Sequence, residues 1–259
     1  MEPRHGVERM RSGLDGRTVL LTGGSSGIGA ATARALAGRG CELILVGRHE
    51  RALRHVAEET GARAVTADLT TPGELTRVAE RATDADVLIN NAGVGWAGRF
   101  TTMSGEDVHR LLTVNLAAPL ELTRLMLPAM RQRGGGHVVF VSSIAAVGVG
   151  DEAVYSATKA GLRAFAAGLR QEAGDSGVEI TTVLPGAVRT PFFRRRGRPY
   201  GRGFPRQVSA ELVASRTVRA IERGGRESFV PRWLGAAARI QGAMPATFER
   251  LNRLFGGRG

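Results

Sequence analysis

The stretch that decides the fold is "RTVLLTGGSSGIGAATARALAGRG", residues 17–40. It begins with a short apolar run typical of a buried strand, continues through a glycine-rich turn, and ends in an alanine- and leucine-rich segment typical of a helix. Gly23, Gly27 and Gly29 would form a tight turn, let the backbone approach a pyrophosphate, and allow the helix to pack closely. Because the N-terminal amides of such a helix attract anions, this strand, turn and helix favour dinucleotide binding.

The same alternation of strand and helix continues along the chain. Further strand-like runs lie at residues 41–47, 62–68, 85–93, 136–143, 177–186 and 227–231. Helical stretches between them include residues 50–61, 72–82, 106–132 and 153–173. Nearly continuous apolar strands separated by helices are typical of a parallel sheet that is covered on both faces. We therefore predict an α/β fold, a single-domain doubly wound Rossmann fold with a mainly parallel sheet of about seven strands.

Length and composition restrict the class of protein. A chain of 259 residues with 42% hydrophobic residues can bury a sizeable core, and no internal repeat or linker divides it, so we predict one domain over residues 1–259. A single cysteine, Cys41, excludes an intrachain disulfide and a multi-cysteine metal site, and we predict no metal. Residues 1–16 lack the apolar run of a signal peptide, and no apolar stretch is long enough to span a bilayer, so we expect a cytoplasmic protein.

The net charge of +12 comes entirely from the last part of the chain. Residues 1–188 contain 20 Lys+Arg and 20 Asp+Glu, whereas residues 189–259 contain 16 Arg and 4 Glu. A solvated basic face and a surface for an acidic partner are both compatible with this distribution. Few aromatic residues accompany the arginines and no recognised motif is present, so we do not expect nucleic-acid binding.

The segment "AVYSATKAGL", residues 153–162, contains Lys159, the only lysine among 36 Lys+Arg residues. Tyr155, one of two tyrosines, lies four residues before it, so a helix would place both side chains on one face. Taken alone, the pair is more typical of an exposed helix surface than of a reactive site. Its interpretation depends on the motifs around it.

Six short motifs occur in order along the chain. They are "TGGSSGIG" at 22–29, "NNAG" at 90–93, Asn115 within "TVNLAAP", "VSS" at 141–143, "YSATK" at 155–159 and "PGAVRTPF" at 185–192. Together they resemble the short-chain dehydrogenase/reductase (SDR) family over about residues 15–192. The resemblance implies an oxidoreductase that transfers hydride between a nicotinamide and the carbon of a ketone or secondary alcohol.

Such a reaction leaves or consumes a proton on the substrate oxygen, so the site needs a group that exchanges a proton near neutral pH. The resemblance assigns this acid/base role to Tyr155. A nearby ammonium would favour the phenolate and lower the pKa of Tyr155 from its ordinary value of about 10. Lysine suits position 159 better than arginine, because a compact ammonium can also reach ribose hydroxyls and join a proton relay, whereas a guanidinium effectively never deprotonates.

The resemblance also implies a serine hydroxyl that orients the substrate oxygen and an asparagine that holds a relay water. Counting forward from Gly136 along the strand points to Ser143, whereas the family's usual separation from the tyrosine points to Ser142. We favour Ser143, because burial fixes strand register while loops absorb deletions. Asn115 fills the asparagine position, and the alternative interpretation is that it satisfies a helix kink before Pro119.

Cofactor choice depends on the end of the second strand, where NAD-specific members carry an acidic residue. Here Gly47 stands at that position and Arg48 follows, which favours NADP(H) over NAD(H). Against this, Ser26 stands where many NADP-binding members have a second cation, and Asp68, which would meet the adenine, could simply cap a turn. The predicted cofactor-binding residues are Gly23, Ser25, Ser26, Gly27, Ile28, Gly29, Arg48, Asp68, Leu69, Asn91, Ala92, Gly93, Tyr155, Lys159, Pro185, Gly186, Val188 and Thr190.

The resemblance leaves the substrate open. The family's substrate lid corresponds to residues 193–210, and pockets of this kind are mostly apolar, so we predict a ketone or alcohol group on a largely apolar molecule. A non-catalytic dinucleotide-binding sensor or interaction module is the alternative, but it would not need the four catalytic residues. Family members pair through helices that correspond to residues 104–132 and 153–173, so a homodimer or homotetramer is expected.

The C-terminal extension, residues 232–259, carries a separate expectation. Phe248, Leu251 and Phe255 recur at helical spacing after Pro245, which predicts a short amphipathic helix. Packing on the protein itself or on a partner subunit is the favoured explanation. Salt-sensitive peripheral contact with an anionic membrane is the alternative, because apolar burial combined with cations binds such lipids.

Overall fold

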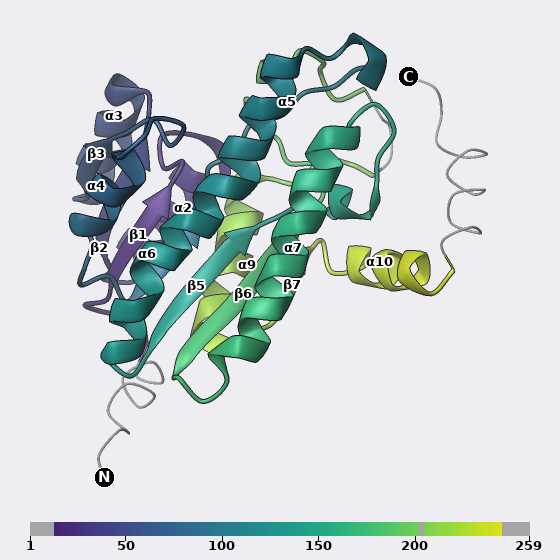
Figure 1. The fold of residues 1–259 in the computed structure, drawn as a ribbon. Coiled ribbons are helices and arrows are strands. Elements are labelled where there is room, and N and C mark those ends of the chain that lie inside the picture. Colours follow the sequence, from purple (N-terminus) through teal and green to yellow (C-terminus); the bar gives the residue numbers. More distant parts are fainter. Residues whose placement is uncertain (1–12, 202–204, 245–259) are drawn as a thin grey trace.

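The computed structural model describes residues 13–201 and 205–244, which form a seven-stranded parallel sheet between layers of helices (Figure 1). The strand order is β3-β2-β1-β4-β5-β6-β7, and every neighbouring pair is parallel. The strands are β1 (Thr18–Thr22), β2 (Glu42–Gly47), β3 (Arg63–Thr66), β4 (Val87–Asn90), β5 (Gly136–Val141), β6 (Val178–Pro185) and β7 (Glu227–Val230). The predicted doubly wound α/β fold is confirmed. The order reverses between β1 and β4, where such a sheet binds ligands beyond its carboxyl ends.

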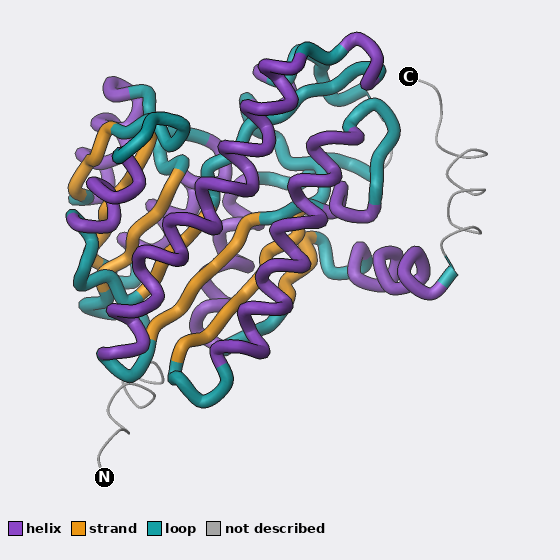
Figure 2. Tube along the Cα trace, in the orientation of Figure 1, coloured by secondary structure: helices purple, strands orange, loops and turns teal. Residues whose placement is uncertain are grey.

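Helices cover both faces of the sheet, as the purple and orange layers of Figure 2 show. One layer contains α2 (Gly27–Ala37), α3 (Glu50–Thr60) and α9 (Ala210–Arg223), and the other contains α4 (Glu74–Glu80), α6 (Ala118–Gln132) and α7 (Ala153–Ala173). Because side chains alternate along a strand, β1 directs Val19 and Leu21 into the first core and Leu20 into the second. All three side chains are fully buried, which explains why the strand is apolar throughout.

The single helix expected at residues 106–132 is divided into three parts. α5 (Gly105–Leu112) and α6 are joined by a π-helical turn, η2 (Thr113–Ala117), which contains Asn115. Pro119 lies in the first turn of α6, directly after this π-helical turn, so it has no backbone N–H to donate to the helical turn before it. Sequence periodicity does not show this break, because a π turn inserts one residue without interrupting the helical pattern.

The end of the chain also differs from expectation. The short helix α8 (Phe192–Arg195) leads into the lid, which has little helical pattern in its sequence, and α10 (Leu234–Ala243) follows β7 at the edge of the sheet (Figure 1). The predicted amphipathic helix with Phe248, Leu251 and Phe255 lies outside the described residues. Within residues 13–201 and 205–244, no helix is long and apolar enough to cross a membrane.

Candidate active site

A cavity of about 970 Å³ lies beyond the carboxyl ends of β1, β2, β4, β5 and β6. The glycine-rich turn, the "NNAG" segment, the end of β5, the start of α7 and the lid all line it. Every residue predicted for the site lines this cavity except Asn115, which lies behind its wall. Among the residues that the structure describes, no group of His, Cys, Asp or Glu could hold a metal ion.

The glycine-rich turn needs glycine for steric reasons at three positions. Gly23 has a φ of +69°, and a Cβ there would lie 2.8 Å from the Cα of Ala92. A Cβ on Gly29 would lie 2.1 Å from the carbonyl oxygen of Gly23, so α2 could not approach the turn. Gly27 has a φ of +57° and contacts Thr190 of the segment after β6. The backbone at the N-terminus of α2 therefore faces the cavity directly, as anion binding requires.

The "NNAG" segment braces this turn from the neighbouring strand. Asn91 donates from Nδ2 to the carbonyl oxygens of Thr22, at 2.9 Å, and Gly23, at 3.2 Å. The Thr22 hydroxyl accepts from the backbone amides of Asn91 and Ala92, both at 3.1 Å. Asn91 therefore has a structural role that fixes the turn beside the cavity.

At the end of β2 the cavity is lined by Gly47 and Arg48, and after β3 by Asp68. The Arg48 side chain is exposed, and its Nε lies 3.4 Å from the Nε2 of His49. Asp68 accepts hydrogen bonds from the amide of Thr70, at 2.9 Å, and from its hydroxyl, at 2.7 Å, and these bonds lower the pKa of the Asp68 carboxyl. Asp68 thus caps the turn after β3 and also faces the cavity.

Asn115 is fully buried in the π-helical turn. Its Oδ1 accepts from the amide of Val94 at 2.8 Å, and its Nδ2 donates to the Val94 carbonyl at 2.9 Å and to the Thr158 hydroxyl at 3.3 Å. A Cβ on Gly93 would lie 3.4 Å from the Asn115 Oδ1 and 3.6 Å from the Lys159 Nζ. The two side chains therefore converge on Gly93, at the wall of the cavity.

The two serines at the end of β5 have different surroundings. Ser142 is buried, and its hydroxyl donates to the carbonyl oxygen of Lys159 at 2.8 Å. The Ser143 Oγ accepts from the amide of Ala145 at 3.1 Å and is hydrogen-bonded to Tyr155. Ser143 is therefore the serine beside the phenol, whereas the Ser142 hydroxyl binds the backbone of α7.

The predicted effect of Lys159 on the pKa of Tyr155 is wrong for this structure. Burial raises the pKa of Tyr155 above its ordinary value, and the hydrogen bond with Ser143 only partly opposes this. The Lys159 Nζ lies 5.8 Å from the centroid of the phenol ring. The four-residue spacing is visible in the sequence, but the burial of the phenol, which disfavours the phenolate, is not.

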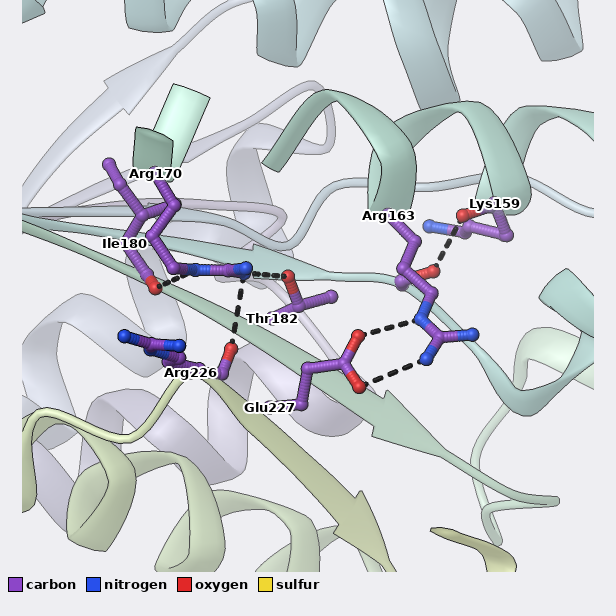
Figure 3. Close-up of polar contacts among 8 residues, drawn as sticks. Lys159, Arg163, Arg170, Ile180, Thr182, Arg226 and Glu227 are labelled. Atoms are coloured by element: carbon purple, nitrogen blue, oxygen red, sulfur yellow. Dashed lines mark hydrogen bonds and ion pairs between the residues drawn. The ribbon is translucent and has the colours of Figure 1, made fainter. Parts of the chain in front are cut away.

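Lys159 is the first of three cations on α7 that bind the sheet, and Figure 3 shows the contacts of the other two, Arg163 and Arg170. Its Nζ donates to the carbonyl oxygen of Val141 at 2.9 Å, and burial lowers the pKa of Lys159 to about 8. One turn further, Arg163 binds the two carboxylate oxygens of Glu227 at 2.6 and 3.0 Å. Arg170 donates to backbone carbonyls of β6 and of the residue before β7. Of these three, Lys159 is the one that lines the cavity.

The lid closes the cavity through contacts that sequence reasoning missed. Phe192 of α8 packs against the phenol ring, with centroids 5.6 Å apart. Arg196, whose side chain is 7% exposed, forms an ion pair with Glu152 at the start of α7, and Arg198 pairs with Asp151 at 3.0 Å. The partners are 44 and 47 residues apart in sequence, and the arginine-rich composition of the lid is the only signal of these pairs.

Comparison with known proteins shows which family this chain resembles in sequence. A family model described as short chain dehydrogenase matches residues 17–200. Ketoacyl reductase HetN of Nostoc sp. is 40% identical over 185 residues, which are 68% of this chain and 64% of that protein, so the match spans less than two thirds of the relative.

Solved structures agree with this match. A short-chain dehydrogenase from Sphingobium yanoikuyae in complex with NADPH is 31% identical, with a TM-score of 0.77 over 89% of this chain and 96% of that one. A bulky-bulky ketone specific alcohol dehydrogenase from Comamonas testosteroni is 29% identical, with a TM-score of 0.74 over 89% of this chain and 94% of that one.

Proposed function

Because the chain belongs to the short-chain dehydrogenase/reductase family of oxidoreductases, we propose that it interconverts a ketone and a secondary alcohol on a largely apolar small molecule, with NADP(H) as the cofactor. The observation that carries the proposal is one cavity lined by the glycine-rich turn and by Ser143, Tyr155 and Lys159. The names of two similar proteins, a ketoacyl reductase and an alcohol dehydrogenase specific for bulky ketones, point to the same reaction class.

The chain's own residues fit a dinucleotide. Gly23, Gly27 and Gly29 leave the backbone open at the N-terminus of α2, and the first turn of that helix has no acidic residue that would repel a phosphate. Gly186, Val188 and Thr190 line the same cavity after β6, and they would contact the carboxamide end of the molecule. A nicotinamide bound there would supply or accept the hydride.

Four side chains would take part in transferring the proton to and from the substrate oxygen. Tyr155 gives a proton to the substrate oxygen in reduction and takes it back in oxidation, and Ser143, hydrogen-bonded to the phenol, holds that oxygen beside it. Because burial raises the pKa of Tyr155, the phenol rests in its neutral form, which is the form that ketone reduction needs. Lys159, with a pKa of about 8, can exchange protons near neutral pH, and Asn115 fixes the wall next to it.

Arg48 supports the preference for NADP(H). Gly47 replaces the acidic residue that would bind ribose hydroxyls and repel a 2′-phosphate, and the exposed Arg48 offers a cation at the rim of the cavity. Arg48→Ala should lower the ratio of kcat/KM for NADPH to that for NADH by about 10-fold or more, because it removes a charge-assisted contact. An unchanged ratio would place the 2′-phosphate elsewhere.

The substrate end of the cavity is mainly apolar around the phenol. Val94, Val149 and Phe192 pack in the cluster that contains Tyr155, and all of them line the cavity. Such surroundings favour an apolar group on the reacting carbon.

A panel of ketones and secondary alcohols, assayed with each reduced and oxidised cofactor, tests the proposal. We expect NADPH-dependent reduction of ketones that carry bulky apolar groups, with Tyr155→Phe as the inactive control. No turnover of any member of the panel, by a protein that binds the cofactor, would contradict the proposed reaction.

Self-association through α5, α6 and α7 is part of the same proposal. Leu112, on α5, exposes 41% of its surface to solvent in the single chain, and covering such apolar surface favours association. We expect a homodimer or homotetramer by light scattering, and a monomer at all concentrations would contradict this part.

A further inference from the structure

The serine at the end of the glycine-rich turn has an unused capping hydroxyl. Ser26 occupies the N-cap position of α2, with φ of −166° and ψ of 167°, yet its side chain makes no capping hydrogen bond. Instead its Oγ accepts a hydrogen bond at 3.2 Å from the Nη1 of Arg195, on the lid helix α8. A cation from a segment 169 residues away thus lies at the turn that lacks one in the sequence.

Residues close to Arg195 in the sequence contact both sides of the cavity. Thr190, five residues earlier, contacts the turn itself, because a Cβ on Gly27 would lie 3.2 Å from the Thr190 Cβ. The next residue, Arg196, is buried against Glu152 on the catalytic side. Arg196 thus points toward α7, whereas Arg195, the residue before it, points toward the N-terminus of α2.

The charge of Arg195 has no partner of opposite sign in the described part of the chain. Two other lid arginines, Arg196 and Arg198, pair with the carboxylates of Glu152 and Asp151. Arg195 instead contacts a neutral hydroxyl, lines the cavity and lies beside the N-terminal amides of α2. A guanidinium and helix N-terminal amides that face one cavity are complementary to a phosphate, which both can bind by charge-assisted hydrogen bonds.

We propose that Arg195 binds the pyrophosphate of the dinucleotide from the lid side, so that this side chain contributes directly to cofactor affinity. This assignment rests on the proposed function, and it adds a residue that no sequence motif marks. It differs from the role of Arg48, which lies at the end of β2 and would contact the 2′-phosphate that only NADPH carries.

Calorimetric titration of NADPH and NADH into the full-length protein tests the assignment without measuring turnover. Arg195→Ala should weaken both cofactors by a similar factor, about 10-fold or more, because both carry a pyrophosphate. Arg195→Lys should recover part of the lost cofactor affinity, because lysine keeps the positive charge but lacks the planar guanidinium that can bind two phosphate oxygens at once. The dissociation constants of Arg195→Ala should also depend less on salt concentration.

Arg194→Ala is the matched control, because Arg194 is the preceding arginine of the same helix, is exposed and does not line the cavity. It should bind both cofactors like the wild type. Equal binding by Arg195→Ala and the wild type would overturn the assignment, and so would a loss confined to NADPH, which would place Arg195 on the 2′-phosphate. A wild-type protein that binds neither cofactor would overturn the proposed function as well, so the two failures are distinguishable.

Discussion

A buried basic side chain lies at each end of β5. Burial lowers the pKa of both, but only one of them is brought closer to neutral pH. At the amino edge of the sheet, where β5 begins, burial lowers the pKa of His137 from 6.5 to about 4. At the cavity edge, where β5 ends, burial lowers the pKa of Lys159 from 10.5 to about 8. Desolvation thus removes His137 from proton exchange near neutral pH and brings Lys159 into range for it.

The polar groups at the two edges also have different partners. At the amino edge Arg17 pairs with Asp86 at 3.4 Å, and the Asp86 carboxylate accepts from the amide of Thr18 at 3.1 Å, so these groups contact other protein groups and do not line the cavity. At the cavity edge Tyr155 and Lys159 line a large open space. Burial alone therefore does not mark a reactive residue, and the distinguishing feature is access to a cavity.

Among the changes considered for the two edges, Tyr155→Phe should have the largest effect on catalysis. Removing the acid/base group should lower kcat/KM by ~10²–10⁴-fold. The dissociation constant of NADPH and the free energy of unfolding should change little, because the change removes one hydroxyl whose partner, Ser143, keeps its bond to the amide of Ala145. Steady-state kinetics, calorimetry and urea unfolding measure the three quantities. Near wild-type turnover would mean that the cavity edge does not contain the proton donor.

Lys159→Arg tests whether an ammonium, and not merely a cation, is needed at the cavity edge. We expect a fall in kcat/KM of about 10²-fold or more, because a guanidinium is larger and effectively cannot release a proton. Arg163→Lys, one turn along the same face of α7, is the matched control and should keep wild-type kcat/KM, since its partner Glu227 lies outside the cavity. Near wild-type activity of Lys159→Arg would contradict the hypothesis that the reaction needs an ammonium at position 159.

The fold was predictable from sequence because its signals are local. Each apolar run and each helical period lies within a few residues, and the glycine-rich turn places the βαβ unit at the start. The steric need for Gly23 and Gly29 follows from the same short segment, since Gly29 packs on the carbonyl of Gly23. Strand register also favours Ser143 as the functional serine, because burial of β5 fixes which residues face the end of the sheet, and this assignment stays a prediction.

The rest of the site depends on contacts between distant segments. The ion pair of Arg196 with Glu152 and the contact of Arg195 with Ser26 join the lid to residues 44 and 169 positions away. The direction of the pKa shift of Tyr155 depends on how deeply the phenol is buried, which spacing on a helix does not reveal. Sequence patterns therefore locate the reactive side chains but not the environment that sets their protonation.

Acidification should destabilise the folded protein through His137, at the amino edge. The Thr181 hydroxyl donates to the carbonyl of Gly225 at 2.5 Å, so its oxygen accepts from the His137 Nε2 at 2.8 Å, and the buried Nδ1 has no hydrogen-bond partner in the described chain. The Glu179 carboxylate lies 3.6 Å from Nδ1 but is about half exposed, so its attraction for an imidazolium is weak.

The sign of this effect follows from the pKa of about 4 in the folded chain, below the 6.5 of an exposed histidine. Above pH 6.5 His137 is neutral in both the folded and the unfolded chain, so it does not lower the free energy of unfolding. Between pH 6.5 and 4 its imidazole is protonated in the unfolded chain but stays neutral in the folded chain, which favours unfolding. The free energy of unfolding should fall by about 2 kcal/mol from pH 7.5 to 5 through this group. Urea unfolding at both values, compared with His137→Gln, measures the difference. Equal pH dependence in the two proteins would show that His137 is not kept neutral.

The smallest expected effect belongs to Arg163, which anchors α7 to the first residue of β7 (Figure 3). Its side chain and that of Glu227 are 34% and 30% exposed, so solvent screens the ion pair, and Arg163→Ala should lower the free energy of unfolding by about 1 kcal/mol or less. A double-mutant cycle with Glu227→Gln should give a coupling free energy that decreases with added salt. Because Lys159 and Arg170 still hold α7 on the sheet, kcat/KM should stay at the wild-type value. A variant that kept its stability but lost turnover would show that the Arg163–Glu227 pair, which lies outside the cavity, positions Tyr155, and access to the cavity would then not be what distinguishes the reactive residues.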